Sequence, residues 1–151
     1  LGLMDTTIYD VEKILKTASK LNPEKKDDLI EVQDKIRRQE SYFRSFFDDT
    51  RCIGKQAYLA GHHTILTYGP HRNDGNLNFA QYVLSLPINK YISGHDHLLA
   101  RSFSANIEFI VSGSGANLSK CKSSPAVGFC KSKIGYFIFR NGNFDIRTIG
   151  E

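Results

Sequence analysis

The chain has no long apolar run, no basic leader segment and no low-complexity tract. No stretch of its 151 residues approaches the ~20 apolar residues that a membrane-spanning helix requires. No positively charged segment precedes an apolar core at the N-terminus, as it would in a signal peptide. Hydrophobic residues make up 40% of the chain and charged residues 24%. This composition predicts a soluble globular protein that forms one domain or part of one, without a membrane-spanning segment.

Cysteine is also scarce, with three residues in the chain. Cys121 and Cys130 bracket an irregular loop, and a disulfide that closed it would indicate an oxidising compartment, whereas reduced thiols fit the residues equally well. The tripeptide Asn117-Leu118-Ser119 matches a glycosylation acceptor, which agrees with secretion or arises by chance. We therefore expect the secretory pathway, with an extracellular or vacuolar/lysosomal location.

The charge of the chain is moderately basic, at +4 with a pI of about 9.0. Scattered lysines and arginines usually form solvated faces, and they also favour anionic substrates. A basic module that binds nucleic acid through Arg37 and Arg38 is one interpretation. Acidic residues interrupt any continuous basic stripe there, so we expect no nucleic-acid partner; they are Asp27, Asp28, Glu31 and Asp34.

Apolar periodicity predicts helices first and strands later. A first helix is expected over about residues 7–20, ended by Asn22-Pro23, and a longer amphipathic helix follows. Its apolar face is expected to hold Leu29, Val32, Ile36, Phe43, Phe46 and Phe47, and its outer face Arg37, Arg38, Glu40 and Arg44. Further strands are expected near 56–60, 91–93 and 108–112, a helix near 77–86, and a final hairpin of 136–140 and 143–149 around Asn141-Gly142. Residues 1–6 read like the end of a buried strand that continues an upstream segment. The order predicts a layered α/β fold with a mixed sheet.

All five histidines lie between His62 and His97, and four of them are in the segments Gly61-His62-His63 and Gly94-His95-Asp96-His97. Imidazole is the commonest metal ligand, and its pKa lies near neutrality. Each segment follows a strand-like run, so both loops can turn toward one cavity at a sheet edge. Solvated polar loops are the plainer interpretation of one such segment, but two together favour a site.

Several motifs carry a resemblance to the calcineurin-like metallophosphatases, and within them to the C-terminal half of the purple, tartrate-resistant acid phosphatase group. They run almost end to end: Met4-Asp5-Thr6, Gln39-Glu40-Ser41-Tyr42-Phe43, Gly61-His62, His71, Gly94-His95-Asp96-His97, Val111-Ser112-Gly113-Ser114-Gly115 and Gly135-Tyr136-Phe137-Ile138. The Gly-His-Asp-His loop is the most specific of them. The resemblance implies half of a four-layer αββα metallophosphoesterase sandwich, with a mixed sheet, flanking helices and a C-terminal β-hairpin. Residues 1–151 would be the C-terminal portion of a single domain whose N-terminal half is absent.

The same resemblance implies a phosphomonoesterase in which a hydroxide activated by two metal ions attacks phosphorus. His62 and His95 would bind one ion and His97 the other, with iron paired with iron, zinc or manganese. His71 would be catalytic, contacting phosphate or protonating the leaving alcohol. Asp96 is expected to orient the loop by hydrogen bonds, with a solvent-facing carboxylate as the alternative. His63 and Thr64 replace the family's usual aromatic residue and proline.

The family's other ligands, two aspartates, an asparagine and a tyrosine, belong to motifs that this chain lacks. Neither Gly-Asp-x-Gly, Gly-Asp-Asn nor Gly-Asn-His-Asp occurs in it. We therefore expect the isolated chain to be a poor phosphatase that packs against the missing N-terminal half and acts on a phosphate ester only with it. The alternative is a catalytically inactive pseudophosphatase that serves as a membrane-associated anchor or scaffold, as in the glideosome-associated members of the group.

Overall fold

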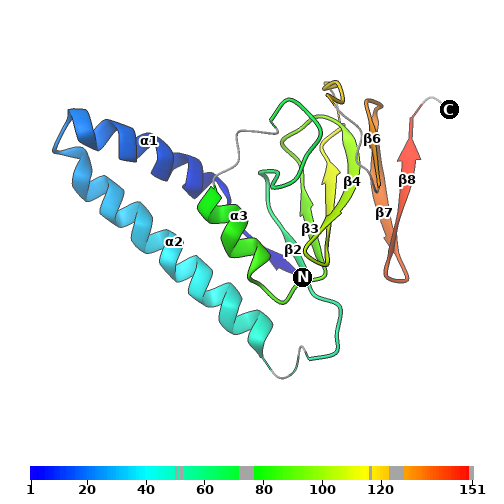
Figure 1. The fold of residues 1–151 in the computed structure, drawn as a ribbon, viewed down its shortest axis with the longest axis horizontal. Helices are drawn as coiled ribbons and strands as arrows, with labels where there is room; N and C mark the ends of the chain where they lie inside the picture. Colours follow the sequence, from blue (N-terminus) through cyan, green and yellow to red (C-terminus); the bar gives the residue numbers. More distant parts are fainter. Residues whose placement is uncertain (50, 52, 72–76, 116, 123–127, 150–151) are drawn as a thin grey trace.

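The computed structural model describes residues 1–49, 51, 53–71, 77–115, 117–122 and 128–149. It has a mixed α/β fold with a six-stranded mixed sheet, flanking helices and a C-terminal antiparallel hairpin (Figure 1). The elements are β1 (Gly2–Leu3), α1 (Thr7–Leu21), α2 (Lys25–Asp48), β2 (Tyr58–Ala60), α3 (Leu77–Leu84), β3 (Lys90–Ser93), β4 (Leu99–Ser104), β5 (Ile107–Ser112), β6 (Phe129–Lys131), β7 (Gly135–Arg140) and β8 (Asn143–Thr148). No described helix combines the length and the apolar character that crossing a membrane requires.

The large sheet has the strand order β1-β2-β3-β5-β4-β6. Its first four strands run parallel, whereas β4 is antiparallel to both β5 and β6. Parallel strands end at the same edge of a sheet, and ligands in open α/β sheets commonly bind outside that edge. Ala60 is paired with Ile92, so the chain leaves β2 and β3 at the same level. The two Gly-His segments therefore start side by side.

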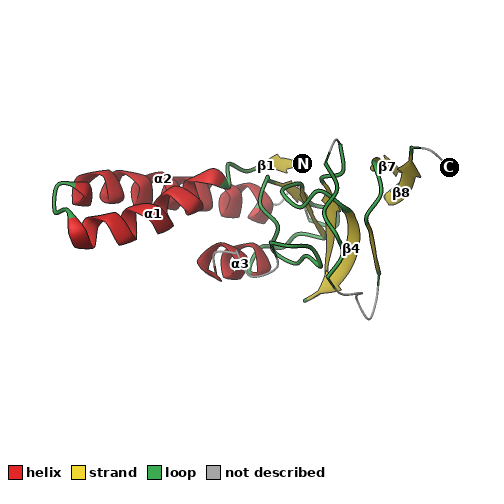
Figure 2. Ribbon diagram, turned by 90° about the horizontal axis from the view of Figure 1, so that it is seen from above, coloured by secondary structure: helices red, strands yellow, loops and turns green. Residues whose placement is uncertain are grey.

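Helices α1 and α2 form a long antiparallel hairpin that extends away from the sheet (Figures 1 and 2). The turn between them contains Asn22-Pro23, and the Asn22 N–H caps α1 by donating to the Ala18 carbonyl at 2.8 Å. Proline cannot continue the hydrogen-bonding ladder, so α1 ends where the sequence predicts. At the sheet end of the hairpin, the Gln39 amide exchanges two hydrogen bonds with the backbone of Asp5, at 2.9 and 3.0 Å. These bonds fix the start of α1 to the middle of α2.

Two details of α2 differ from the expectation. Glu40 is half-buried and accepts a 2.9 Å hydrogen bond from the hydroxyl of Tyr9, which is 2% exposed. The prediction that Glu40 turns outward is therefore wrong, because α1 covers that face. Phe46 was assigned to the core face but is 37% exposed, since the end of α2 extends beyond α1.

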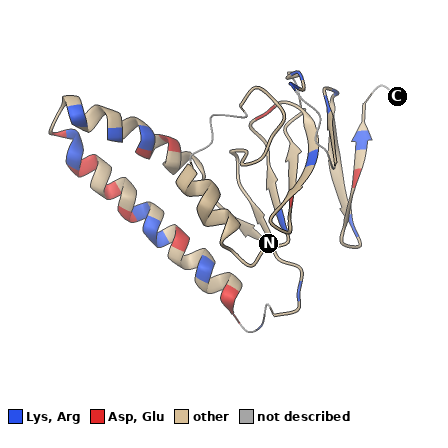
Figure 3. Cartoon of the chain, in the orientation of Figure 1, with Lys and Arg blue, Asp and Glu red and all other residues tan. Residues whose placement is uncertain are grey.

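Positive and negative side chains are interspersed along this helical hairpin (Figure 3). Neighbouring turns of α2 carry the ion pairs Lys25–Asp28, Glu31–Lys35 and Asp34–Arg37. Exposed pairs of this kind contribute little to stability, but they neutralise one another's field. Arg37 is thus engaged by an acidic partner one turn away, which disfavours the basic-stripe interpretation.

The main core lies between the sheet and the helices. Leu59, Tyr91 and Phe109, on three neighbouring strands, are at most 2% exposed and face Phe79 and Val83 of α3. Burying side chains of this size contributes about 1.5–3 kcal/mol each. The strands β2, β3 and β5 are therefore held rigidly beneath the loops that follow them.

The opposite face of the sheet carries a buried charge cluster. Glu108 bridges Lys90 and Arg101 from neighbouring strands, and its side chain is 6% exposed. The hairpin β7-β8 forms a second layer over this face (Figure 2), and the Lys90 ammonium lies 5.7 Å from the ring centroid of Phe144. Tyr136 and Phe139 of the hairpin remain about half exposed. The second layer thus buries only part of its apolar surface.

Most expected elements are present within a few residues of their predicted limits, and the Asn141-Gly142 turn has positive φ at both residues, as a type I′ turn requires. Strands β4 and β6 were not expected. The β4–β5 turn has positive φ at Ala105 and Asn106, where a glycine is usual, so the sequence carries no clear turn signal for this hairpin. Strand β6 contains Cys130, which forms a disulfide with Cys121, so the bonded alternative for these thiols is confirmed.

Candidate metal centre

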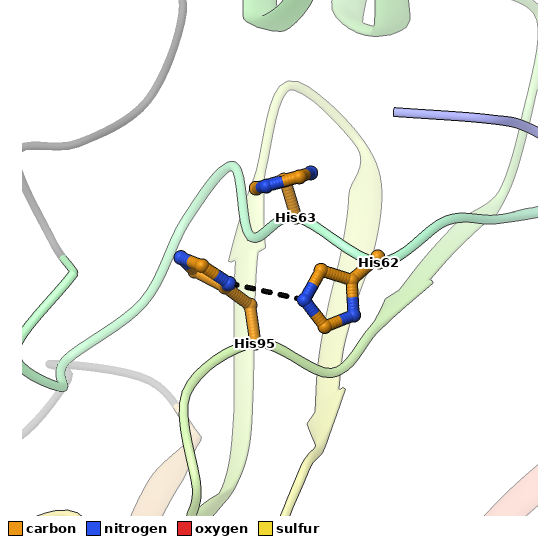
Figure 4. Close-up of side chains that lie close together, drawn as sticks. All are labelled: His62, His63 and His95. Carbon is orange, nitrogen blue, oxygen red and sulfur yellow. Dashed lines mark hydrogen bonds between the residues drawn. The ribbon is translucent and has the colours of Figure 1, made fainter. Parts of the chain in front are cut away.

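His62 and His95 converge from the loops that follow β2 and β3. Two backbone bonds continue the pairing of the strands into the loops: the Gly61 N–H donates to the Ile92 carbonyl and the Gly94 N–H to the His62 carbonyl, both at 3.0 Å. His62 Nε2 then lies 3.1 Å from His95 Nδ1 (Figure 4). The arrangement brings together two of the three histidines that the resemblance assigned to metal.

His63 is a third member of this cluster, although the sequence did not assign it a role. One ligand atom from each of His62, His63 and His95 lies within 4.8 Å of the others. His63 also contacts α1, because its Nε2 is 2.7 Å from an Asp10 carboxylate oxygen and its Nδ1 is 2.8 Å from Thr6 Oγ1. The spacing of Thr6 and Asp10 places both on one side of a helix start, but no local pattern in the sequence indicates that His63 lies against them.

The hydrogen bonds of Thr6 determine the tautomer of His63. Thr6 Oγ1 accepts the backbone N–H groups of His62 and His63 at 3.1 and 3.0 Å, so its own proton is directed to His63 Nδ1. Neutral His63 then carries its proton on Nε2 and donates it to Asp10. Both ring nitrogens are occupied, so His63 would have to break one bond before it could bind a metal ion.

His71 and His97 occupy different positions relative to the cluster. The His71 ring packs against His95, with ring centroids 4.2 Å apart, and both line one cleft. His97 is exposed and is not one of the three histidines that the described residues bring together. The metal-binding role of His97 and the catalytic role of His71 therefore remain predictions.

Asp96 links the loop after β3 to the loop that carries His71. Its side chain is fully buried and accepts hydrogen bonds from the Thr67 hydroxyl and from the His71 backbone N–H, the latter at 3.2 Å. A Cβ on Gly69 would lie 2.5 Å from the same carboxylate, so this close approach requires glycine. The expectation that Asp96 orients the loops by hydrogen bonds is confirmed, and the solvent-facing alternative is wrong.

The loop of His95 has an unusual backbone conformation. His95 has a φ of 55°, in the left-handed region that non-glycine residues rarely adopt. Gly113 lies directly beneath this loop, where a Cβ would come 1.9 Å from the Asp96 carbonyl oxygen. The Ser-Gly-Ser-Gly segment thus makes the space in which the His95 loop can fold. Strained backbone of this kind persists where the surroundings enforce it, as they do at functional sites.

The environment of His62 and His95 favours their neutral forms. Burial lowers the pKa of His62 below its ordinary value, and the neighbouring His63 lowers it further. Burial, followed by the proximity of His71 and the other two clustered histidines, likewise lowers the pKa of His95. Neutral imidazole is the form that binds metal.

The donor atoms fit a transition-metal ion. Ligand distances of about 2.0–2.1 Å in tetrahedral geometry require nitrogens roughly 3.3 Å apart, close to the 3.1 Å between His62 and His95. Imidazole donors suit zinc, iron, copper and nickel rather than magnesium or calcium. Among the described residues, the group that could hold an ion consists of these three histidines without a carboxylate, so it supplies donors for one ion and no bridge to a second.

An open cleft of about 730 Å³ lies beside the histidines. Helix α1 forms one wall, Phe79 of α3 forms another, and the polar end consists of His63, His71 and His95. A ligand bound at the cluster would therefore have room to extend along α1.

Comparisons with known proteins bear on the fold alone. No family model and no curated protein matches the chain. Among solved structures it is similar to GAP50, described as the anchor in the inner membrane complex of Plasmodium, with a TM-score of 0.55 and 20% sequence identity. The match covers 89% of this chain and 39% of GAP50, so the chain spans well under half the length of that structure. The comparison supports a shared architecture.

Proposed function

We propose that this chain supplies the histidine half of a metal-dependent phosphomonoester hydrolase of the acid-phosphatase type. The observation that supports this most strongly is the approach of His62 and His95 to 3.1 Å at the carboxyl ends of two parallel strands. Their lowered pKa values and the strained backbone of His95 fit a metal centre better than a solvated polar loop. The composite resemblance of the motifs points to the same chemistry.

Each residue of the cluster has a distinct task in this proposal. His62 and His95 would hold the ion, which when bound supplies positive charge that clamps a phosphate and polarises a water molecule. His71, which packs against His95 in the same cleft, would hold a proton for the leaving alcohol. Asp96 holds the backbone of His71 and so fixes the distance between the two loops.

The metal ligands of this chain are too few for a two-metal centre, so a further protein segment has to supply the rest. A two-metal centre needs a bridging carboxylate, and Asp10, the acidic residue among the described residues that line the cleft, is already bound to His63. The half-exposed aromatic residues of the β7-β8 hairpin also leave apolar surface for another element to cover. We propose that the N-terminal half of a metallophosphoesterase domain supplies both the remaining ligands and this cover.

An anchoring role is the second candidate. It is favoured by the similarity in fold to GAP50, which is described as an anchor in a membrane complex. A protein with that role keeps the fold but has no need of bound metal or of phosphate turnover. Metal binding therefore separates the two proposals.

The test begins with calorimetric titration of the chain with Zn²⁺ and Mn²⁺. We expect submillimolar binding that His62→Ala and His95→Ala each weaken by at least tenfold. His97→Ala is the informative companion variant: unchanged affinity would restrict the first ion to the converging histidines, whereas an equal loss would extend the ligand set to His97. Unchanged affinity in both the His62 and His95 variants would refute the metal centre.

Activity is then measured on the chain joined to the N-terminal half of a metallophosphoesterase domain. Hydrolysis of a phosphate ester that is lost in the His95 variant would support the hydrolase. A joined protein that is metal-free and inert would favour the anchor.

A further inference from the structure

The cleft beside the histidine cluster has two chemically different ends. Three imidazoles lie at one end, and an apolar wall formed by Ile14, Ala18 and Phe79 continues from them. We propose that this cleft binds a monoalkyl phosphate, with its phosphate at the histidines and its alkyl chain along α1. The position of the phosphate rests on the proposed function, whereas the apolar subsite is defined by the cleft itself.

The polar end can accommodate an anion. Lys13 is the one lysine or arginine among the described residues that line the cleft, and it lies one turn along α1 from Asp10. Asp10 is the one acidic residue among them, and its carboxylate is engaged by His63 at 2.7 Å. An incoming phosphate would therefore meet a cation, imidazoles and a carboxylate that already has a partner.

The apolar wall of the cleft indicates the chemical class of the organic part of the ligand. Ile14 and Ala18 line the cleft one helical turn apart on α1, opposite Phe79, and the polar residues Asp10, Lys13 and Thr17 line the same face of the helix beside them. Eight residues of helix separate Asp10 from Ala18, about 12 Å, which is long enough for an extended octyl chain with its phosphate at the polar end. A sugar phosphate of that length would place hydroxyl groups against this apolar wall.

Exposure within the cleft supports an apolar ligand. Ile14 is 66% exposed although it faces the cavity, so a bound alkyl chain would remove apolar surface from water. Such burial contributes about 25 cal/mol for each Å². The volume of about 730 Å³ also lies within the usual range for small-molecule sites.

The experiment compares three probes on the whole chain, with and without Zn²⁺, by calorimetry below the micelle concentration. The probes are octyl phosphate, ethyl phosphate and octanol. We expect octyl phosphate to bind the zinc-loaded chain at least tenfold more tightly than ethyl phosphate, because each further methylene lies on the apolar wall. Octanol should bind weakly, and its affinity should not depend on zinc.

Two matched pairs of variants locate the ligand. Ile14→Asn should weaken octyl phosphate about tenfold and leave ethyl phosphate unchanged, whereas Ile30→Asn, at a comparably exposed position on α2, should change neither. Lys13→Gln should weaken both phosphates by severalfold, and Lys20→Gln, on α1 but outside the cleft, should weaken neither.

The outcomes separate this proposal from the proposed function. Equal affinity for octyl and ethyl phosphate would refute the alkyl subsite without contradicting the proposed metal centre. Octanol binding without phosphate binding would support the apolar subsite and overturn phosphate recognition. No binding of any probe would overturn the cleft as a ligand site, whereas the Zn²⁺ titration of the unmodified chain decides separately whether the metal centre stands.

Discussion

Asp96 offers the sharpest test of how the histidine loops are held. Its buried carboxylate accepts hydrogen bonds from Thr67 and from the backbone of His71. A hydrogen bond to a charged acceptor contributes about 1.5–3 kcal/mol, so the loss of both bonds in Asp96→Ala should lower the free energy of unfolding by roughly 3–6 kcal/mol. That loss is a large part of the total stability of a typical domain, about 5–15 kcal/mol.

Urea denaturation followed by circular dichroism measures this loss. Asp96→Asn keeps the volume and one acceptor oxygen, so it should cost about half as much and provides a folded variant if the alanine form does not fold. Asp145→Ala, at an exposed position on β8, is the matched control and should change stability by less than about 0.5 kcal/mol. A loss below about 1 kcal/mol for Asp96→Ala would refute the idea that this carboxylate ties the loops together.

Metal affinity provides a second readout of the same variants. If Asp96 positions the loops, Asp96→Asn should weaken Zn²⁺ binding about 10-fold or more, as is typical when the support of a metal ligand is lost. The control at Asp145 should bind normally. A folded Asp96→Asn protein with unchanged zinc affinity would show that the carboxylate stabilises the loops without orienting the ligands.

Three further predictions follow from other parts of the structure. Because the folded state lowers the pKa of His62 and His95, the unfolded chain binds more protons below about pH 6.5, and the free energy of unfolding should fall as the pH drops through that range. Urea denaturation between pH 7.5 and 5.5 measures this dependence of the free energy of unfolding on pH, and the dependence should be weaker when both histidines are replaced by alanine. Reduction of the Cys121–Cys130 bond, which spans nine residues, should cost about 2–3 kcal/mol, and equal urea midpoints with and without reductant would contradict this. Glu108→Ala should cost about 3–5 kcal/mol because it leaves two cations without their shared partner, and a loss below about 1 kcal/mol in urea would show that the pairing is not needed.

Elements with strong local signals could be predicted from the sequence, and those that depend on distant partners could not. Two predictions depend only on consecutive residues: the end of the first helix at Asn22-Pro23 and the turn at Asn141-Gly142. Both are confirmed by the structure. Strand β4 is half polar in sequence, without a clear apolar run, and forms because β5 and β6 supply hydrogen bonds on both sides. Tertiary pairing overrides local propensity in such cases.

The candidate site shows the same division. The Gly-His pattern placed His62 and His95 on neighbouring loops, and parallel strands with matched register bring them together. The roles of Thr6 and Asp10 depend on where α1 starts relative to β2, which no local pattern specifies. His63 was therefore treated as a departure from the family motif, although it is the residue that connects helix α1 to the cluster.

Two glycines, Gly69 and Gly113, explain how the Gly-His-Asp-His segment is packed. Gly113 and Gly69 each lie where a Cβ would collide with Asp96, one with its backbone and the other with its carboxylate. Glycine at both positions leaves room for Asp96 to be buried between the two loops, next to His95 in its left-handed conformation. The Gly-His-Asp-His and Ser-Gly-Ser-Gly segments are thus two sides of one packing requirement. That requirement positions the histidines whether the cluster serves a hydrolase or persists in an anchor, which is why metal affinity and turnover, rather than the fold, must decide between them.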